Sequence, residues 1–192
     1  MAQVTRIRVR WRLRLAALIC LILAAGLFPR VASSQTDPAP GAPLEYRLKA
    51  VFLLDFTKFI DWPPGTLGAP DSPFSICVLG NNPFGNELDR VVNGEVVYGR
   101  KAAVRKIASP QAPGSCQIVF VGLQDETSEL LAQLGRGVLT VGEGGEFIRG
   151  GGMISFVVEN HRVRFDINQA AAERAGFKLS SKLLSVAKSV LR

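Results

Sequence analysis

Apolar residues recur at helical spacing over residues 45–60, early in the chain. The members of this pattern are Leu48, Val51, Phe52, Phe56, Phe59 and Ile60. Leu53 and Leu54 widen the apolar stripe, so little of the predicted helix is polar. Such a helix is buried on several sides or meets a partner. Trp62 is expected to end it, because Pro63 follows and the residue before a proline avoids the helical conformation.

Short apolar runs of β-forming residues predict buried strands further along the chain. The clearest are residues 74–79, 117–121 and 137–141, and weaker candidates are 96–98 and 101–107. Helical patterns at 83–92, 127–134 and 146–149 lie between them. Strands that alternate with helices favour a three-layer α/β/α sandwich with a mainly parallel sheet.

The last 40 residues predict a hairpin and two helices. Residues 153–158 and 162–167 form the two strands, which turn at Glu159-Asn160-His161 and are expected to add an antiparallel edge to the sheet. Asn168 caps a helix that Gly176 ends. Ser181 opens a final helix in which the apolar residues up to Leu191 lie on one side.

The N-terminal segment has the three parts of a secretory signal peptide, which we assign to residues 1–34. Five arginines alternate with apolar residues, an apolar run follows over 15–28, and small residues stand near Ser33. This run is shorter than the roughly 20 residues that span a bilayer, although an uncleaved anchor is the alternative. Residues 35–43 are a flexible Pro/Ala/Gly leader, and 44–192 form a single domain. The mature protein is therefore expected to be exported to a compartment where disulfides persist.

The positive charge of the chain belongs to this N-terminal segment. The formal net charge is +7, but residues 1–33 contain six arginines and no acid. The rest of the chain has 17 basic and 16 acidic side chains. Nucleic acid is therefore not expected as a partner.

Catalytic constellations are scarce, and we expect neither an enzyme nor a metal or cofactor. His161 is the only histidine and stands at the hairpin turn, where an exposed residue is the simple interpretation. One histidine and two mature cysteines do not supply a usual zinc site. Gly80 and Gly85 have phosphate-loop spacing, but Asn86-Glu87 replace the residues that would touch phosphate and metal. An exported hydrolase remains a minor alternative.

A small-ligand site is a further alternative. A glycine-rich loop spans residues 142–152, and a turn follows the strand that ends near Gly80. The glycines either approach a ligand or supply positive φ angles. Ligands of parallel sheets bind at the carboxyl ends of the strands, where both segments would lie. The candidate residues are Gly80, Asn81, Gly151, Gly152, Arg164 and Asn168, although Arg164 is most simply a solvated or ion-paired side chain.

The two cysteines of the mature chain predict a disulfide. Cys77 lies within the first sheet strand and Cys116 just before the next strong one. Neighbouring strands can bring their Cα atoms to about 5.5 Å, and an exported protein meets oxidising conditions. Two buried free thiols are the alternative.

Four ordered blocks of the sequence resemble the YfiR family of periplasmic proteins. They are residues 46–63, 77–85, 151–156 together with 163–168, and 179–184, so the resemblance covers about residues 45–190. It implies a non-enzymatic regulator that represses the periplasmic sensor part of an inner-membrane diguanylate cyclase. Release of the cyclase would raise cyclic di-GMP and favour biofilm growth. Unlike some inhibitor-type members, this chain has no second cysteine pair in its C-terminal half.

The first helix is the expected contact surface for that partner. Its candidate residues are Phe52, Phe56, Lys58, Phe59 and Trp62. An outer-membrane lipoprotein that sequesters the inhibitor and a homodimer are further partners that the resemblance allows.

Overall fold

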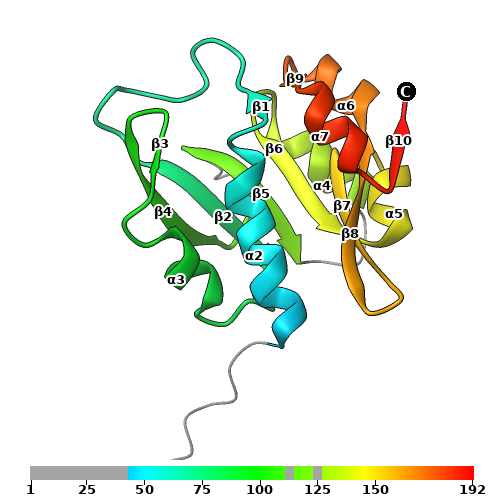
Figure 1. Ribbon diagram of the computed structural model, residues 1–192. Helices are drawn as coiled ribbons and strands as arrows, with labels where there is room; N and C mark the ends of the chain where they lie inside the picture. The colour runs from blue at the N-terminus through cyan, green and yellow to red at the C-terminus, as the bar shows by residue number, and fades with distance from the viewer. Residues whose placement is uncertain (1–42, 111–114, 123–126) are drawn as a thin grey trace, which may run out of the picture. The chain divides into compact units, whose positions relative to one another are not determined.

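A computed structural model of the protein describes residues 43–110, 115–122 and 127–192 (Figure 1). The expected signal peptide and all of the leader except Pro43 lie outside these ranges. Among the helices described, none is both long enough and apolar enough to cross a membrane.

The core of the fold is a sheet whose strands follow the order β10-β8-β7-β6-β5-β2-β4-β3. These strands are β2 (Phe74–Gly80), β3 (Val96–Val97), β4 (Arg100–Ile107), β5 (Cys116–Gly122), β6 (Leu139–Glu143), β7 (Ile154–Glu159), β8 (Arg162–Asn168) and β10 (Ser189–Leu191). The central run from β4 to β7 is parallel, and β10 is parallel to β8. The pairs β7–β8 and β3–β4 are antiparallel.

Helices cover both faces of this sheet (Figure 1). Ile76 and Val78 of β2 point to one face, which is covered by α2 (Leu44–Phe56), α3 (Glu87–Val92), α6 (Gln169–Arg174) and α7 (Ser181–Val186). Cys77 and Leu79 point to the other face, where α4 (Thr127–Leu134) and α5 (Gly144–Arg149) lie. The predicted three-layer sandwich is confirmed.

The first helix is shorter than its apolar pattern predicts. It ends at Phe56, where the Thr57 hydroxyl donates to the carbonyl of Leu54 at 2.6 Å. Residues Ile60–Asp61 instead form β1, which pairs antiparallel with β9 (Lys178–Leu179). The amide of Ser180 also donates to the Phe59 carbonyl at 2.9 Å. Pairing with a distant segment therefore replaces the last helical turn, and Trp62 does not end the helix.

The expected long C-terminal helix is also wrong. The helix stops at Val186, and the chain continues as β10 along β8. The amide of Lys188 donates to the Phe165 carbonyl at 2.8 Å and starts this pairing. The antiparallel hairpin therefore lies one strand inside the edge of the sheet.

Local signals around the hairpin and the helix that follows it are confirmed. Asn160 and His161 have φ angles of 50° and 59°, which suits a two-residue hairpin turn, and His161 is exposed. The Asn168 side chain accepts from the Ala171 amide at 2.9 Å and caps α6. Gly176, with φ of 95°, follows its last turn.

The predicted disulfide is present. Cys77 and Cys116 are bonded, with their Cα atoms 5.9 Å apart. Both cysteines are buried on the face of the sheet that α4 and α5 cover. The bond ties β2 to β5, which are neighbouring parallel strands in the interior of the sheet.

Candidate functional site

A cleft opens at the carboxyl ends of β2, β5 and β6. Its volume is about 500 Å³; the partly exposed rings of Tyr46 and Pro83 contribute apolar surface, and Asn81, Glu143 and the Tyr46 hydroxyl contribute polar groups. The strand order changes direction here, because the chain moves from β2 to β4 on one side and then returns to β5 on the other. Ligands of open α/β sheets bind at such switch points.

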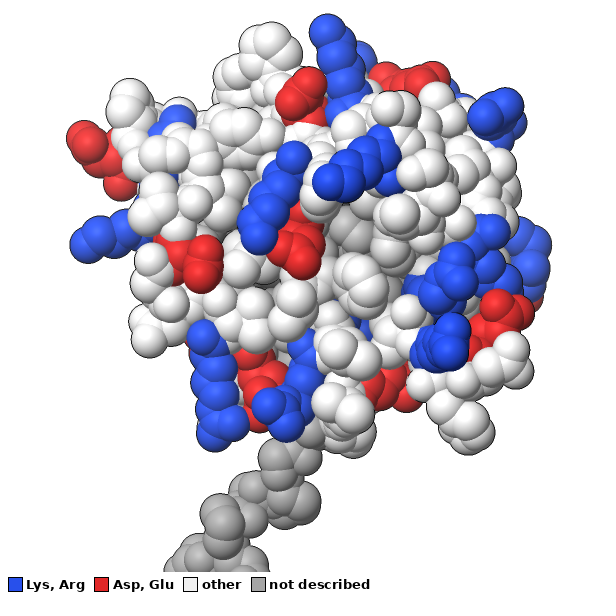
Figure 2. All heavy atoms as spheres, in the orientation of Figure 1, with Lys and Arg blue, Asp and Glu red and all other residues white. Residues whose placement is uncertain are grey.

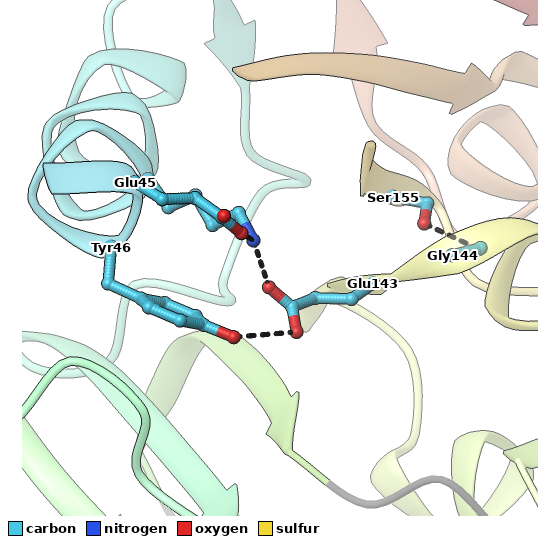
Figure 3. Close-up of polar contacts among 6 residues, drawn as sticks. Glu45, Tyr46, Glu143, Gly144 and Ser155 are labelled. Atoms are coloured by element: carbon cyan, nitrogen blue, oxygen red, sulfur yellow. Dashed lines mark hydrogen bonds and ion pairs between the residues drawn. The ribbon is translucent and has the colours of Figure 1, made fainter. Parts of the chain in front are cut away.

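Glu143, the last residue of β6, is the polar centre of the cleft. Its carboxylate accepts hydrogen bonds from the ammonium of Lys49 and from the hydroxyl of Tyr46, the latter at 3.3 Å (Figure 3). Lys49 also pairs with Glu45, one turn earlier in α2. Nearby, the Ser155 hydroxyl donates to the carbonyl of Gly144 at 2.7 Å. Helix α2 is thus held to the end of the sheet by polar contacts.

The protonation states of these groups follow from their surroundings. Burial alone lowers the pKa of Lys49, but hydrogen bonds to Glu143 and Glu45 raise its pKa overall. Burial raises the pKa of Tyr46, and the negative charge of Glu143 raises it further. At neutral pH, Lys49 is therefore an ammonium ion and Tyr46 a neutral donor.

Two close approaches of the backbone shape the cleft and the adjacent loop. A Cβ atom at Gly122 would lie 2.0 Å from the carbonyl oxygen of Asn81. Phe147 fills the space over Gly142 and Gly152, where a Cβ atom would lie 2.5 and 2.1 Å from its ring. Space for Phe147, and not only a positive φ angle, therefore requires glycine in this loop.

The structure does not bring the predicted ligand residues together. Asn81 lines the cleft and Gly80 comes directly before Asn81 in the sequence, as the predicted small-ligand site at the end of this strand requires. In the sheet register Gly80 lies level with Phe156, four residues beyond Gly152. The amides of Gly151 and Gly152 bond to carbonyls of α5, and the Asn168 side chain caps α6. Arg164 is exposed near the hairpin turn.

The predicted site residues do not include Tyr46, Lys49 and Glu143. Glu143 stands directly after a predicted strand, which is a position where ligand-binding side chains gather, and this signal could have identified it. Tyr46 and Lys49 lie 97 and 94 residues away from Glu143 in the sequence. Nothing local in the sequence marks that contact.

The segment with phosphate-loop spacing is an ordinary turn, as the residues Asn86-Glu87 indicate. The Asn82 side chain donates to the Gly85 carbonyl at 3.2 Å and accepts from the Phe84 amide at 3.0 Å. The helix after it begins at Glu87 and not at Pro83. Within the described ranges, no group of three or more His, Cys, Asp or Glu side chains is placed to hold a metal ion.

A second, smaller hollow lies between α2 and α7, and we call it the aromatic groove. Its volume is about 150 Å³, and its lining residues are Phe52, Asp55, Phe56, Phe59, Phe165, Lys182, Leu183 and Val186. Val186 is half exposed, and the Lys182 ammonium lies 5.4 Å from the ring centre of Phe59. Figure 2 shows uncharged surface with a shallow hollow beside α2, with charged side chains of both signs around it.

The aromatic groove contains only part of the predicted partner surface. Phe52 and Phe59 are partly buried and remain accessible, and Lys58 is exposed, where it pairs with Asp55 at 2.7 Å. Phe56 is only 1% exposed, stacks on Phe156 and meets Phe165 edge-to-face, so its expected exposure is wrong.

Trp62 is also a core residue. Its indole donates to the Gln117 carbonyl at 3.3 Å, and its ring packs against Phe74, Tyr98 and Phe177. The burial of Trp62 removes it from the predicted partner surface.

The outer side of α2 has an apolar stripe that the sequence pattern also predicts. Leu44, Leu48 and Val51 are exposed by 68%, 43% and 43%. Their spacing places them on one side of the helix. Within the described part of the chain, therefore, α2 buries one side against the sheet and leaves apolar side chains facing outwards.

Comparisons with known proteins give two matches. The profile of the YfiR/HmsC-like family matches residues 46–188. The chain is also similar to the crystal structure of a conserved domain protein from Vibrio cholerae, with 13% sequence identity and a TM-score of 0.49. That alignment covers 78% of this chain and 60% of the Vibrio chain, so this chain spans less than two thirds of that protein's length. None of the curated proteins compared matches.

Proposed function

Because the chain belongs to the YfiR/HmsC-like family, we propose that it is an exported regulatory protein that represses an inner-membrane diguanylate cyclase. It binds the periplasmic sensor part of the cyclase and lowers cyclic di-GMP. The observation that carries this proposal is the family match over residues 46–188, which covers nearly all of the described chain. The family is regulatory and non-catalytic, which supports a binding role for this chain.

The proposed organisation of the chain fits export. Residues 1–34 direct secretion and are removed, 35–43 form a leader, and 44–192 form the regulatory domain. The Cys77–Cys116 disulfide supports this organisation, because such bonds persist in the periplasm and are rare in the cytosol.

The contact surface for the cyclase is the aromatic groove together with the apolar stripe of α2. Phe52, Phe59 and Val186 offer an apolar hollow, and Lys58 and Lys182 offer positive charge at its margin. Well-packed apolar anchors within a polar margin contribute most of the binding energy in protein interfaces. Of the five predicted partner residues, Phe52, Lys58 and Phe59 remain candidates.

Measurement of cyclic di-GMP in cells tests the function. The partner to use is a cyclase with a periplasmic sensor segment, encoded next to this gene. We expect deletion of this protein to raise cyclic di-GMP, and the wild-type protein to copurify with the cyclase from detergent-solubilised membranes. Unchanged cyclic di-GMP after both deletion and overproduction would show that the proposal is wrong.

A pair of variants tests the surface. Val186→Glu places a charge in the aromatic groove at a half-exposed position, so the fold should survive and copurification should fall at least about tenfold. Val96→Glu is the matched control, because Val96 is 62% exposed on β3, at the opposite edge of the sheet. Equal losses in both variants would contradict this placement of the interface.

A further inference from the structure

The cleft at the ends of β2, β5 and β6 has the size and composition of a small-molecule site. Its volume of about 500 Å³ lies within the range of roughly 300–1,000 Å³ that ligand pockets occupy. Tyr46 and Pro83 are partly exposed and provide apolar surface, and Asn81 and Glu143 provide polar groups. The aromatic groove, by contrast, is less than a third as large and lies between two helices.

Glu143 retains acceptor capacity that its protein partners do not use. One carboxylate oxygen accepts from Lys49 and the other from Tyr46, and each oxygen has two lone pairs. The Glu143 side chain is 37% exposed, so a further donor can reach these free positions from the cleft. A ligand with a donor group can therefore bind without breaking the ion pair to Lys49.

The charges around the cleft favour a cation over an anion. The carboxylates of Glu45, Glu143 and Glu146 outnumber the cations of Lys49 and Arg149. The Lys49 ammonium is buried and already bonded to two of these carboxylates, and Arg149 is bonded to the third. An anionic ligand would meet no free cation among these residues, whereas an ammonium group would meet excess negative charge.

We propose that this cleft binds a small molecule that carries a primary amine on an apolar ring, with the ammonium at Glu143 and the ring against Tyr46 and Pro83. An ammonium–carboxylate hydrogen bond orients the ligand, and the apolar walls remove its ring from water. This proposal does not rest on the regulatory function, since it concerns a different part of the surface.

The site is connected to α2, which also forms the aromatic groove. Tyr46 and Lys49 reach Glu143 from the first turns of α2 (Figure 3). Phe52 lies in the same helix, and Phe59 lies just beyond its end. A ligand that bonds to Glu143 therefore acts on the residues that fix the position of this helix.

Isothermal titration of the purified protein with 2-phenylethylamine tests the proposal, with 3-phenylpropionate and 2-phenylethanol as anionic and neutral analogues. We expect saturable binding of one amine per chain and at least about tenfold weaker binding of both analogues. Glu143→Gln should weaken the binding of the amine about tenfold. Asn81→Trp, a change at an exposed residue, should fill the mouth of the cleft and abolish binding.

Glu159→Gln is the control, because this carboxylate lies on the hairpin and away from the cleft. Its affinity for the amine should equal that of the wild type. Thermal melting of each variant checks that the fold is intact. Three results would overturn the proposal: no binding of the amine at millimolar concentration, equal affinity for the anionic analogue, or a folded Glu143→Gln variant with unchanged affinity. Repression of the cyclase is measured separately, so either proposal can fail alone.

Discussion

At the scale of single residues, the position of the Phe147 ring depends on two glycines that have no side chain to occupy its space. Gly142 at the end of β6 and Gly152 before β7 leave the space that the ring fills, and a Cβ atom at either position would overlap it. The short helix α5 is thereby packed onto the strands that flank it. Residues 142–152 thus contain both the Phe147 ring and the two glycines that leave space for it.

Gly152→Ala should destabilise the protein by about 1–3 kcal/mol, because the new methyl group overpacks the ring of Phe147. Urea denaturation measures the change in the free energy of unfolding. The same substitution in a Phe147→Val background should have a much smaller effect, since the overlapping ring atoms are gone. Equal effects in both backgrounds would show that the ring is not the cause.

At the scale of elements, the disulfide joins β2 and β5 across 39 residues. Closing a loop of this length should stabilise the protein by roughly 4 kcal/mol in the chain-entropy model. The double variant Cys77→Ala/Cys116→Ala should therefore melt roughly 10 °C below the oxidised wild type. Dithiothreitol should lower the melting temperature of the wild type and leave that of the variant unchanged. Two free thiols under non-reducing alkylation would contradict the disulfide itself.

The sequence predicts those elements best whose signals are local. The bounds of α4, the hairpin turn at Asn160-His161 and the cap at Asn168 follow from spacing, turn chemistry and capping. The pairing of Ile60–Asp61 with Lys178–Leu179 depends on segments that are far apart in the sequence. The strand after Val186 has apolar residues at helical spacing, so the pattern wrongly predicts a helix there.

The candidate site divides in the same way. Asn81 at the cleft follows from its place after a buried strand, and the aromatic residues of α2 follow from helical spacing. The helical spacing does not show which side of an apolar helix faces the sheet. The sequence therefore could not distinguish the buried Phe56 from the accessible Phe52 and Phe59. The contact of Lys49 with Glu143 joins elements 94 residues apart and has no local signature.

At the scale of the whole molecule, stability should fall in alkaline solution. The pKa values of Lys49 and Tyr46 are raised in the folded state, and burial together with the charge of Asp61 raises that of Tyr98. A raised pKa means that the folded state binds more protons than the unfolded state between the two pKa values. The stabilisation is therefore complete below the ordinary pKa values near 10 and is lost as the pH rises above them.

Urea denaturation between about pH 8 and about pH 11 tests this expectation. The free energy of unfolding should be flat up to about pH 9 and then decline. Tyr98→Phe removes one of the three groups and should reduce the slope of the decline. A free energy of unfolding that increases above about pH 10 would contradict the assignment.

Together with the proposed export, the position of β2 between β4 and β5 has a consequence for the order in which the sheet becomes structured. A chain that crosses the inner membrane from its N-terminus delivers β2 before the other strands of this sheet, with both edges of β2 unpaired. One edge is covered after Ile107 emerges and the other only after Gly122, and the disulfide can close only after Cys116. During that interval the strand FSICVLG is an exposed apolar segment with open backbone groups. A periplasmic holding chaperone should therefore bind the nascent protein before oxidation and release it afterwards.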